Sequence, residues 1–189
     1  MPQRPVSSRP NTSALSVAEI ASTCSLERKQ RFGGLHFFNP VPQMKLVEVV
    51  RTADTLQETY EALIDFSRRL NKRPVTCKDT PGFIVNRLLI PYLREAMAMF
   101  ERGDASAEDI DTAMKLGAGY PMGPLELTDF VGLDTSKFIA DGWRERIETS
   151  EEELHIPLHI LKPSPLMEKL VSEGKLGRKT GEGIFRYTK

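Results

Sequence analysis

The run Asp79-Thr-Pro-Gly82 is the strongest structural break in the 189-residue chain. Adjacent proline and glycine favour a turn over a regular element. Before this break, β-branched and aromatic runs alternate with helical periodicity, whereas every later signal is helical. We therefore predict an α/β segment at residues 13–79 and an all-α domain at residues 80–189, so that the chain is mainly α overall.

The first twelve residues differ from the rest in composition. They contain three prolines, two arginines and two serines but no acidic residue. Proline at that density excludes a regular helix, so residues 1–12 are predicted to be a disordered N-terminus. A mitochondrial transit peptide is also rich in Arg and Ser, but it forms an amphipathic helix, and this alternative is therefore less favoured.

The charge balance excludes several classes of partner. Lys and Arg total 26, and Asp and Glu also total 26, so the formal net charge is zero. A nucleic-acid partner or an anionic membrane surface is therefore not predicted. No apolar run approaches the roughly 20 residues of a membrane span. Cys24 and Cys77 form neither a zinc motif nor a disulfide framework, which favours a reducing compartment.

Two apolar runs on either side of a proline-rich turn predict a β-hairpin. Residues 34–38 and 45–50 are rich in aromatic and β-branched side chains, and the turn between them is centred on Pro42. A hairpin with that centre pairs residues whose numbers add up to 84, so His36 faces Glu48. Such neighbours lie close enough for a carboxylate to orient an imidazole as a general base. By the residues alone, a structural histidine bonded to a glutamate is the favoured alternative.

Capping residues and apolar spacing predict the helices. The long helix expected at residues 83–102 is apolar around so much of its circumference that it must be buried on more than one side, and Pro91 is predicted to kink it. A solvated acidic loop is expected at residues 148–159. The predicted helix starts are the Ser16/Glu19 and Thr55/Glu58 capping boxes, Ser106, Pro124, Asp134 and Ser164.

Three further patterns are interpreted as structural. The glycines between Gly117 and Gly123 follow a helix instead of a strand, so they indicate an interhelical turn and not a dinucleotide loop. Residues 177–180 lack the glycine before lysine that a P-loop requires, although Lys179 can still reach an anion. His155 and His159 have metal-pair spacing, but a proline lies between them, and no metal site is predicted.

Several longer motifs, taken together and in order, resemble the short-chain L-3-hydroxyacyl-CoA dehydrogenases of fatty-acid β-oxidation. The resemblance runs from about residue 11 to residue 189. The motifs are Asn11-Thr-Ser13, Gly34-Leu-His-Phe-Phe-Asn-Pro-Val-Pro42, Met44-Lys-Leu-Val-Glu-Val49, Lys78-Asp-Thr-Pro-Gly-Phe-Ile-Val-Asn-Arg-Leu88, Gly119-Tyr-Pro-Met-Gly-Pro124, Val131-Gly-Leu-Asp134 and Lys179-Thr-Gly-Glu-Gly183.

The resemblance implies a reaction and a set of site residues. Such an enzyme oxidises an L-3-hydroxyacyl-CoA to the 3-ketoacyl-CoA and passes a hydride to NAD. The implied catalytic residues are His36 as general base, Glu48 as its orienting partner, and Ser13 and Asn86 at the substrate oxygen. The implied cofactor contacts are Ser13, Asn39 and Lys179.

The chain also departs from this family. No strand is followed by a Gly-rich dinucleotide fingerprint, so residues 13–79 are interpreted as the C-terminal remnant of a Rossmann-type NAD-binding domain. The favoured interpretation is a truncated 3-hydroxyacyl-CoA dehydrogenase that is weakly active or inactive alone. The alternatives are a non-catalytic dimerising or structural module of the same fold, and a chain that acts with a separate nucleotide-binding chain.

The resemblance also implies an assembly and a location. It implies a homodimer formed through the helical domain at residues 80–189, with a 3-hydroxyacyl-CoA as the small-molecule partner. It implies the mitochondrial matrix, with the cytoplasm as the alternative because residues 1–12 lack the character of a transit peptide. Acyl-chain preference does not follow from these motifs.

Overall fold

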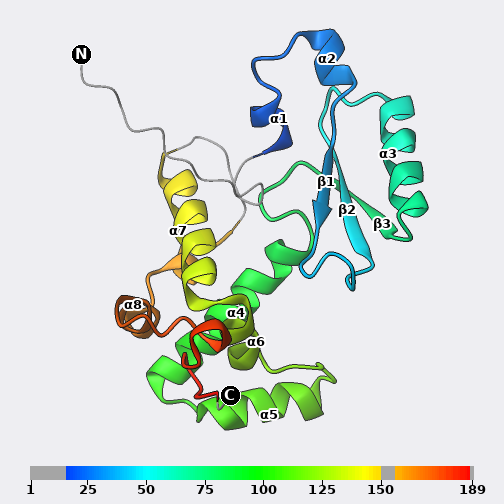
Figure 1. The fold of residues 1–189 in the computed structure, drawn as a ribbon. Coiled ribbons are helices and arrows are strands. Elements are labelled where there is room, and N and C mark those ends of the chain that lie inside the picture. Colours follow the sequence, from blue (N-terminus) through cyan, green and yellow to red (C-terminus); the bar gives the residue numbers. More distant parts are fainter. Residues whose placement is uncertain (1–15, 150–155, 188–189) are drawn as a thin grey trace. The chain divides into compact units, whose positions relative to one another are not determined.

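The computed structural model describes residues 16–149 and 156–187. The chain divides into two compact units, Met1–Ile84 and Val85–Lys189, which we call the sheet unit and the helical unit. The described part of the sheet unit contains three strands and three helices. The described part of the helical unit contains helices, two short 3₁₀ turns and two isolated β-bridges near its C-terminal end (Figure 1). A partial Rossmann-like unit followed by a helical one is thus observed, and the chain is mainly α.

The sheet unit is built around a central strand. Strand β2 pairs antiparallel with β1 and parallel with β3, and helix α3 forms the crossover and packs against β2 and β3. A parallel connection through a helix is the βαβ arrangement that the alternating pattern predicts. The elements are α1 (Val17–Ile20), α2 (Leu26–Gln30), β1 (Gly34–Phe37), β2 (Leu46–Arg51), α3 (Gln57–Arg69) and β3 (Arg73–Lys78).

The register of the hairpin is the predicted one. Gly34 pairs with Val50 and His36 pairs with Glu48, so each pair of residue numbers adds up to 84. Because β2 lies between two strands, its middle residues, including Glu48, are buried. One small apolar cluster of this unit consists of Val17, Val50 and Phe83, with Phe32 and Cys77 packed against it.

The helical unit buries two apolar clusters. One involves α4, α5, α6, α7 and α8 and includes Met97, Leu125 and Leu133; the other surrounds Trp143 and includes Leu161. The elements are α4 (Val85–Arg102), α5 (Ala107–Gly117), α6 (Pro124–Val131), α7 (Leu133–Thr149), η1 (Leu158–Leu161), α8 (Pro165–Ser172) and η2 (Arg178–Thr180).

Several predicted helix starts are confirmed. Ser16 and Glu19 form a complete capping box, and the side chains of Ser106 and Ser164 accept from Asp109 and Met167 N–H. Pro124 is the first residue of α6, as expected for a residue that lacks a backbone donor. Gly117 is the last residue of α5, so the predicted interhelical turn begins directly after this helix.

The capping box predicted at Thr55 and Glu58 is wrong. Helix α3 begins after Leu56, which makes no side-chain cap. The Thr55 hydroxyl instead accepts from Thr52 N–H and donates to the Phe32 carbonyl, at 3.0 and 2.8 Å. Thr55 is buried, and these two bonds orient its hydroxyl so that it does not cap α3.

Two other expectations need correction. Asp134 does not cap α7, because the helix begins at Leu133 and the Asp134 carboxylate is bonded elsewhere. The acidic loop expected at residues 148–159 is wrong at both ends, since α7 extends to Thr149 and Ile156 is buried in the Trp143 cluster. Residues 150–155 of that loop, with His155, lie outside the described residues, as do residues 1–12. Helix α2 was not expected.

Within residues 16–149 and 156–187, no helix is long and apolar enough to cross a membrane.

Candidate active site

His36 and Glu48 form a close pair at the middle of the β1–β2 ladder. The Nδ1–H of His36 donates to Glu48 Oε2 over 2.7 Å. The Glu48 side chain is 0% exposed and the His36 side chain is 13% exposed. Because a carboxylate can only accept, this bond places the imidazole proton on Nδ1 and leaves Nε2 with a free lone pair.

The second oxygen of Glu48 is held from another direction. The backbone N–H of Ile84 donates to Glu48 Oε1 over 3.0 Å. A buried carboxylate needs such partners, because removing it from water without hydrogen bonds is costly. Glu48 is therefore held by both oxygens, and its orientation toward His36 is set from two sides.

Two aromatic rings contact the imidazole of His36. The Phe38 ring meets it edge-on at a centroid distance of 4.6 Å, and the Phe83 ring is tilted against it at 5.3 Å. Phe38 directly follows β1 and is two residues from His36, the spacing at which side chains of an extended chain lie on the same side. The imidazole is thus packed between apolar neighbours, with one nitrogen hydrogen-bonded to a carboxylate.

This arrangement can accept a proton at Nε2. An imidazole is the side chain best suited to proton transfer near neutral pH, and a carboxylate on Nδ1 fixes its tautomer and stabilises the imidazolium that forms. The pair is therefore competent as a general base.

The other predicted site residues are distributed between the two units. Asn39 is exposed and follows β1 in the sheet unit, three residues from His36. Asn86 is half-buried in the first turn of α4, in the helical unit. Ser13 lies outside the described residues.

Lys179 lies in η2 and is paired with an acid. Its ammonium group donates to both carboxylate oxygens of Asp134, at 2.5 and 2.7 Å. A Cβ at Gly132, whose φ is +101°, would come within 3.0 Å of Lys179 Nζ and 2.9 Å of Asp134 Oδ1. The glycine therefore lets the chain pass close to this ion pair. Sequence reasoning missed Asp134 as the partner because it assigned that residue to a helix cap.

The pKa of the Cys77 thiol depends on burial and on the negative charges near it. Burial raises the pKa of Cys77 to about 12, with further contributions from the negative charges of Glu48 and Asp79. The thiol is thus strongly biased toward its protonated form, which is neither a nucleophile nor a metal ligand.

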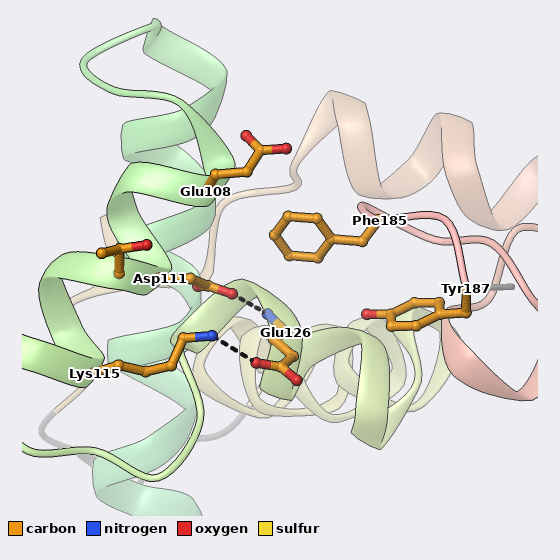
Figure 2. A pocket seen from close by; sticks show the side chains of 7 residues that line it. Glu108, Asp111, Lys115, Glu126, Phe185 and Tyr187 are labelled. Atoms are coloured by element: carbon orange, nitrogen blue, oxygen red, sulfur yellow. Dashed lines mark hydrogen bonds and ion pairs between the residues drawn. The ribbon is translucent and has the colours of Figure 1, made fainter.

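A separate cavity of about 320 Å³ lies in the helical unit (Figure 2). Two of its acids have structural partners: Asp111 accepts from Leu125 and Glu126 N–H, each at 2.8 Å, and Glu126 accepts from Lys115 at 3.1 Å. Burial raises the pKa of Asp111, and its two backbone hydrogen bonds oppose that shift. These groups serve the packing of α5 against α6.

The described residues do not fit a whole dinucleotide. None of β1, β2 and β3 leads through a Gly-rich turn into a helix, which is the element that holds a pyrophosphate in Rossmann folds. Among the described residues, no group of three or more His, Cys, Asp or Glu side chains is arranged to hold a metal ion.

Two family models match the chain. Residues 8–80 match the NAD-binding domain of 3-hydroxyacyl-CoA dehydrogenase, and residues 82–187 match the C-terminal domain of 3-hydroxyacyl-CoA dehydrogenase. Both matched descriptions are domains of one class of protein, the dehydrogenases with an NAD-binding domain. Within that class, the chain belongs to the 3-hydroxyacyl-CoA dehydrogenase family.

Individual relatives agree with this assignment. The mitochondrial hydroxyacyl-coenzyme A dehydrogenase of Homo sapiens is 63% identical over 94% of the chain and 53% of its own length. The 3-hydroxybutyryl-CoA dehydrogenase of Clostridioides difficile is 44% identical over 95% of the chain and 60% of its length. The chain thus spans about half the length of the curated relatives it matches.

Solved structures also resemble the chain. A crystal structure of (S)-3-hydroxybutyryl-CoA dehydrogenase from Ralstonia eutropha superimposes with a TM-score of 0.82 at 41% identity, covering 95% of this chain and 59% of that one. The fold of this chain is therefore similar to that of a dehydrogenase with a solved structure.

Proposed function

We propose that this chain carries the proton-transfer part of the active site of an NAD-dependent L-3-hydroxyacyl-CoA dehydrogenase. The observation that carries the proposal is the 2.7 Å bond between His36 and a fully buried Glu48. A buried carboxylate on an imidazole that retains some exposure is an arrangement suited to a general base. The family assignment supplies the reaction that uses it.

In the proposed reaction, Nε2 of His36 accepts the proton of the substrate 3-hydroxyl. The C–H bond at the same carbon breaks with its electron pair, and the carbonyl of the 3-ketoacyl-CoA forms. NAD, when bound, supplies the acceptor for that hydride. Glu48 stabilises the imidazolium, and Ser13 and Asn86 are proposed to hold the substrate oxygen.

The cofactor contacts proposed for this chain are Ser13, Asn39 and Lys179. They serve the reacting end of the cofactor, because the described residues provide no pyrophosphate-binding turn. We therefore propose that the 189-residue chain alone has little or no dehydrogenase activity. A nucleotide-binding half, in the same chain or another, would be needed for full turnover.

A homodimer through the helical unit is also proposed. Leu88 on α4 is 70% exposed and Leu116 at the end of α5 is 82% exposed. An apolar cavity of about 330 Å³ lies between α4 and α5, lined in part by Tyr92, Met99 and Ala113. Exposed apolar surface of this kind is typical of association sites.

The mitochondrial names of several relatives support a location in the mitochondrial matrix.

The decisive experiment uses a chimera in which the upstream half of the human dehydrogenase precedes this chain. Glu48→Gln should reduce kcat by about 10²- to 10⁴-fold, since it removes the charge that stabilises the imidazolium. NADH binding should change much less. The matched control is Glu58→Gln, the same change at an exposed position of the sheet unit. Equal turnover in the two variants would refute the assignment.

A further inference from the structure

The backbone between β3 and α4 has an uncommon conformation beside the His36–Glu48 pair. Gly82 and Phe83 are both left-handed, with φ of +78° and +49°. Glycine adopts this region freely, but for a bulky residue such as phenylalanine it is strained. A strained residue persists only where the surrounding contacts hold it, and such residues cluster at functional sites.

The first consequence of this turn concerns Glu48. Phe83 N–H donates to the Thr80 carbonyl over 2.9 Å, which closes the turn. The next amide, that of Ile84, then donates to Glu48 Oε1 over 3.0 Å. The left-handed backbone at Phe83 precedes that amide directly, so its conformation determines where the Ile84 N–H is aimed.

The second consequence concerns His36. The Phe83 side chain is 8% exposed, and its ring lies 5.3 Å from the imidazole centroid at an interplanar angle of 55°. A cavity of about 110 Å³ is lined by both His36 and Phe83. Without the Phe83 ring, the imidazole would have space in which to turn away from Glu48.

We propose that Phe83 is a positioning residue for the His36–Glu48 pair. Its backbone aims the Ile84 amide at one oxygen of Glu48, while its ring holds the imidazole of His36 against the other. One residue thereby fixes both members of the pair. This inference rests on the proposed function for its catalytic meaning, but the geometry it predicts can be measured without substrate.

The test is the tautomer of His36 in the 189-residue chain. Long-range ¹H–¹⁵N spectra at mildly alkaline pH distinguish Nδ1–H from Nε2–H, and His36→Gln identifies the His36 signals by their loss. The unmodified chain should show Nδ1 protonated, with a slowly exchanging proton. Phe83→Leu keeps apolar volume but removes the ring, so it should lose that proton signal and shift the two nitrogen resonances toward each other.

Phe32→Leu is the matched control. Phe32 packs against the same apolar cluster, but Phe38 and Phe83 are the rings that contact His36 in the described residues. Phe32→Leu should leave the His36 resonances unchanged. Unchanged resonances in Phe83→Leu would overturn the proposal, as would equal shifts in both variants.

Folding is checked by circular dichroism, and Phe83→Met is the second variant. If both Phe83 variants are unfolded while Phe32→Leu is folded, Phe83 acts as a core residue and the proposal is wrong. A changed tautomer in Phe83→Leu together with normal turnover of the Glu48→Gln chimera would support the positioning role and refute the proposed function. An unchanged tautomer in Phe83→Leu together with reduced turnover of the Glu48→Gln chimera would refute only the positioning role.

Discussion

Gly183 packs closely against the carboxylate of Asp129. A Cβ at residue 183 would come within 2.1 Å of Asp129 Oδ1 and 2.6 Å of the Gly177 Cα. Asp129 is fully buried and accepts from Ile184 N–H, Phe185 N–H and the Tyr187 hydroxyl, each at 2.9 Å. The segment after η2 is thus fastened to α6 through one carboxylate that only glycine can approach so closely.

Gly183→Ala should therefore destabilise the chain. The new methyl group must displace either the Asp129 carboxylate or the backbone at Gly177, and such overpacking costs about 1–3 kcal/mol. Urea denaturation followed by circular dichroism measures the change. Gly142→Ala is the control, because residue 142 is inside α7 and a new Cβ there would meet no atom within 4 Å apart from the neighbouring helix backbone. There, alanine should stabilise the helix by up to about 1 kcal/mol. Equal stability of the two variants would contradict this account.

The thiol of Cys77 should report the charge on Glu48. Its pKa is raised to about 12 by burial, then by Glu48 and Asp79. Replacing Glu48 with glutamine removes one negative charge, so the thiolate becomes easier to form and the pKa falls. One pKa unit corresponds to about a tenfold change in thiolate fraction, and we expect an alkylation rate about three- to tenfold higher at fixed alkaline pH.

This rate is measured with iodoacetamide in a Cys24→Ser background, so that Cys77 is the one thiol present. Glu58→Gln in the same background is the control, since that glutamate is exposed on α3. If Glu48→Gln and Glu58→Gln react at the same rate, Glu48 does not carry the charge that its proposed role requires.

The 189-residue chain should not bind NADH with micromolar affinity. Association costs at least about 4 kcal/mol before contacts compensate, and most dinucleotide affinity comes from a pyrophosphate at a helix N-terminus and from an acid on the ribose. The described residues contain no strand, Gly-rich turn and helix in sequence. Calorimetric titration of the folded chain, with the chimera as positive control, measures this directly. A micromolar dissociation constant for the chain would show that the described glycines have been misinterpreted.

The helical unit should mediate self-association of the chain. Ala113 is exposed and lines the apolar cavity between α4 and α5. Ala113→Glu places a charge in that cavity and should shift a dimer toward monomer in sedimentation at tens of micromolar, because the charge would have to be desolvated. Thr112→Glu is the control, since Thr112 is exposed and lines the other cavity on α5. A monomeric unmodified chain at that concentration would refute the dimer.

Local chemistry explains which helix starts could be predicted. Ser16, Ser106 and Ser164 cap their helices because a hydroxyl three residues before an amide needs nothing from the rest of the chain. Thr55 has the same pattern, but its hydroxyl bonds to Thr52 and Phe32 instead. The prediction of a cap at Thr55 is wrong because a distant donor or acceptor can outcompete a local cap.

For the site, the sequence by itself determined that His36 and Glu48 face each other. They are 12 residues apart across one turn, and a hairpin register follows from where the turn lies. Only the tertiary structure decided that Glu48 is fully buried, that Ile84 binds its second oxygen and that Phe83 packs on His36. Ile84 is 36 residues from Glu48 and Phe83 is farther still from His36, so these contacts depend on how β3 and the turn after it return to the sheet. The pairing of His36 with Glu48 follows from their spacing along the chain, whereas the burial of Glu48 and the positioning of the pair arise from packing between distant segments.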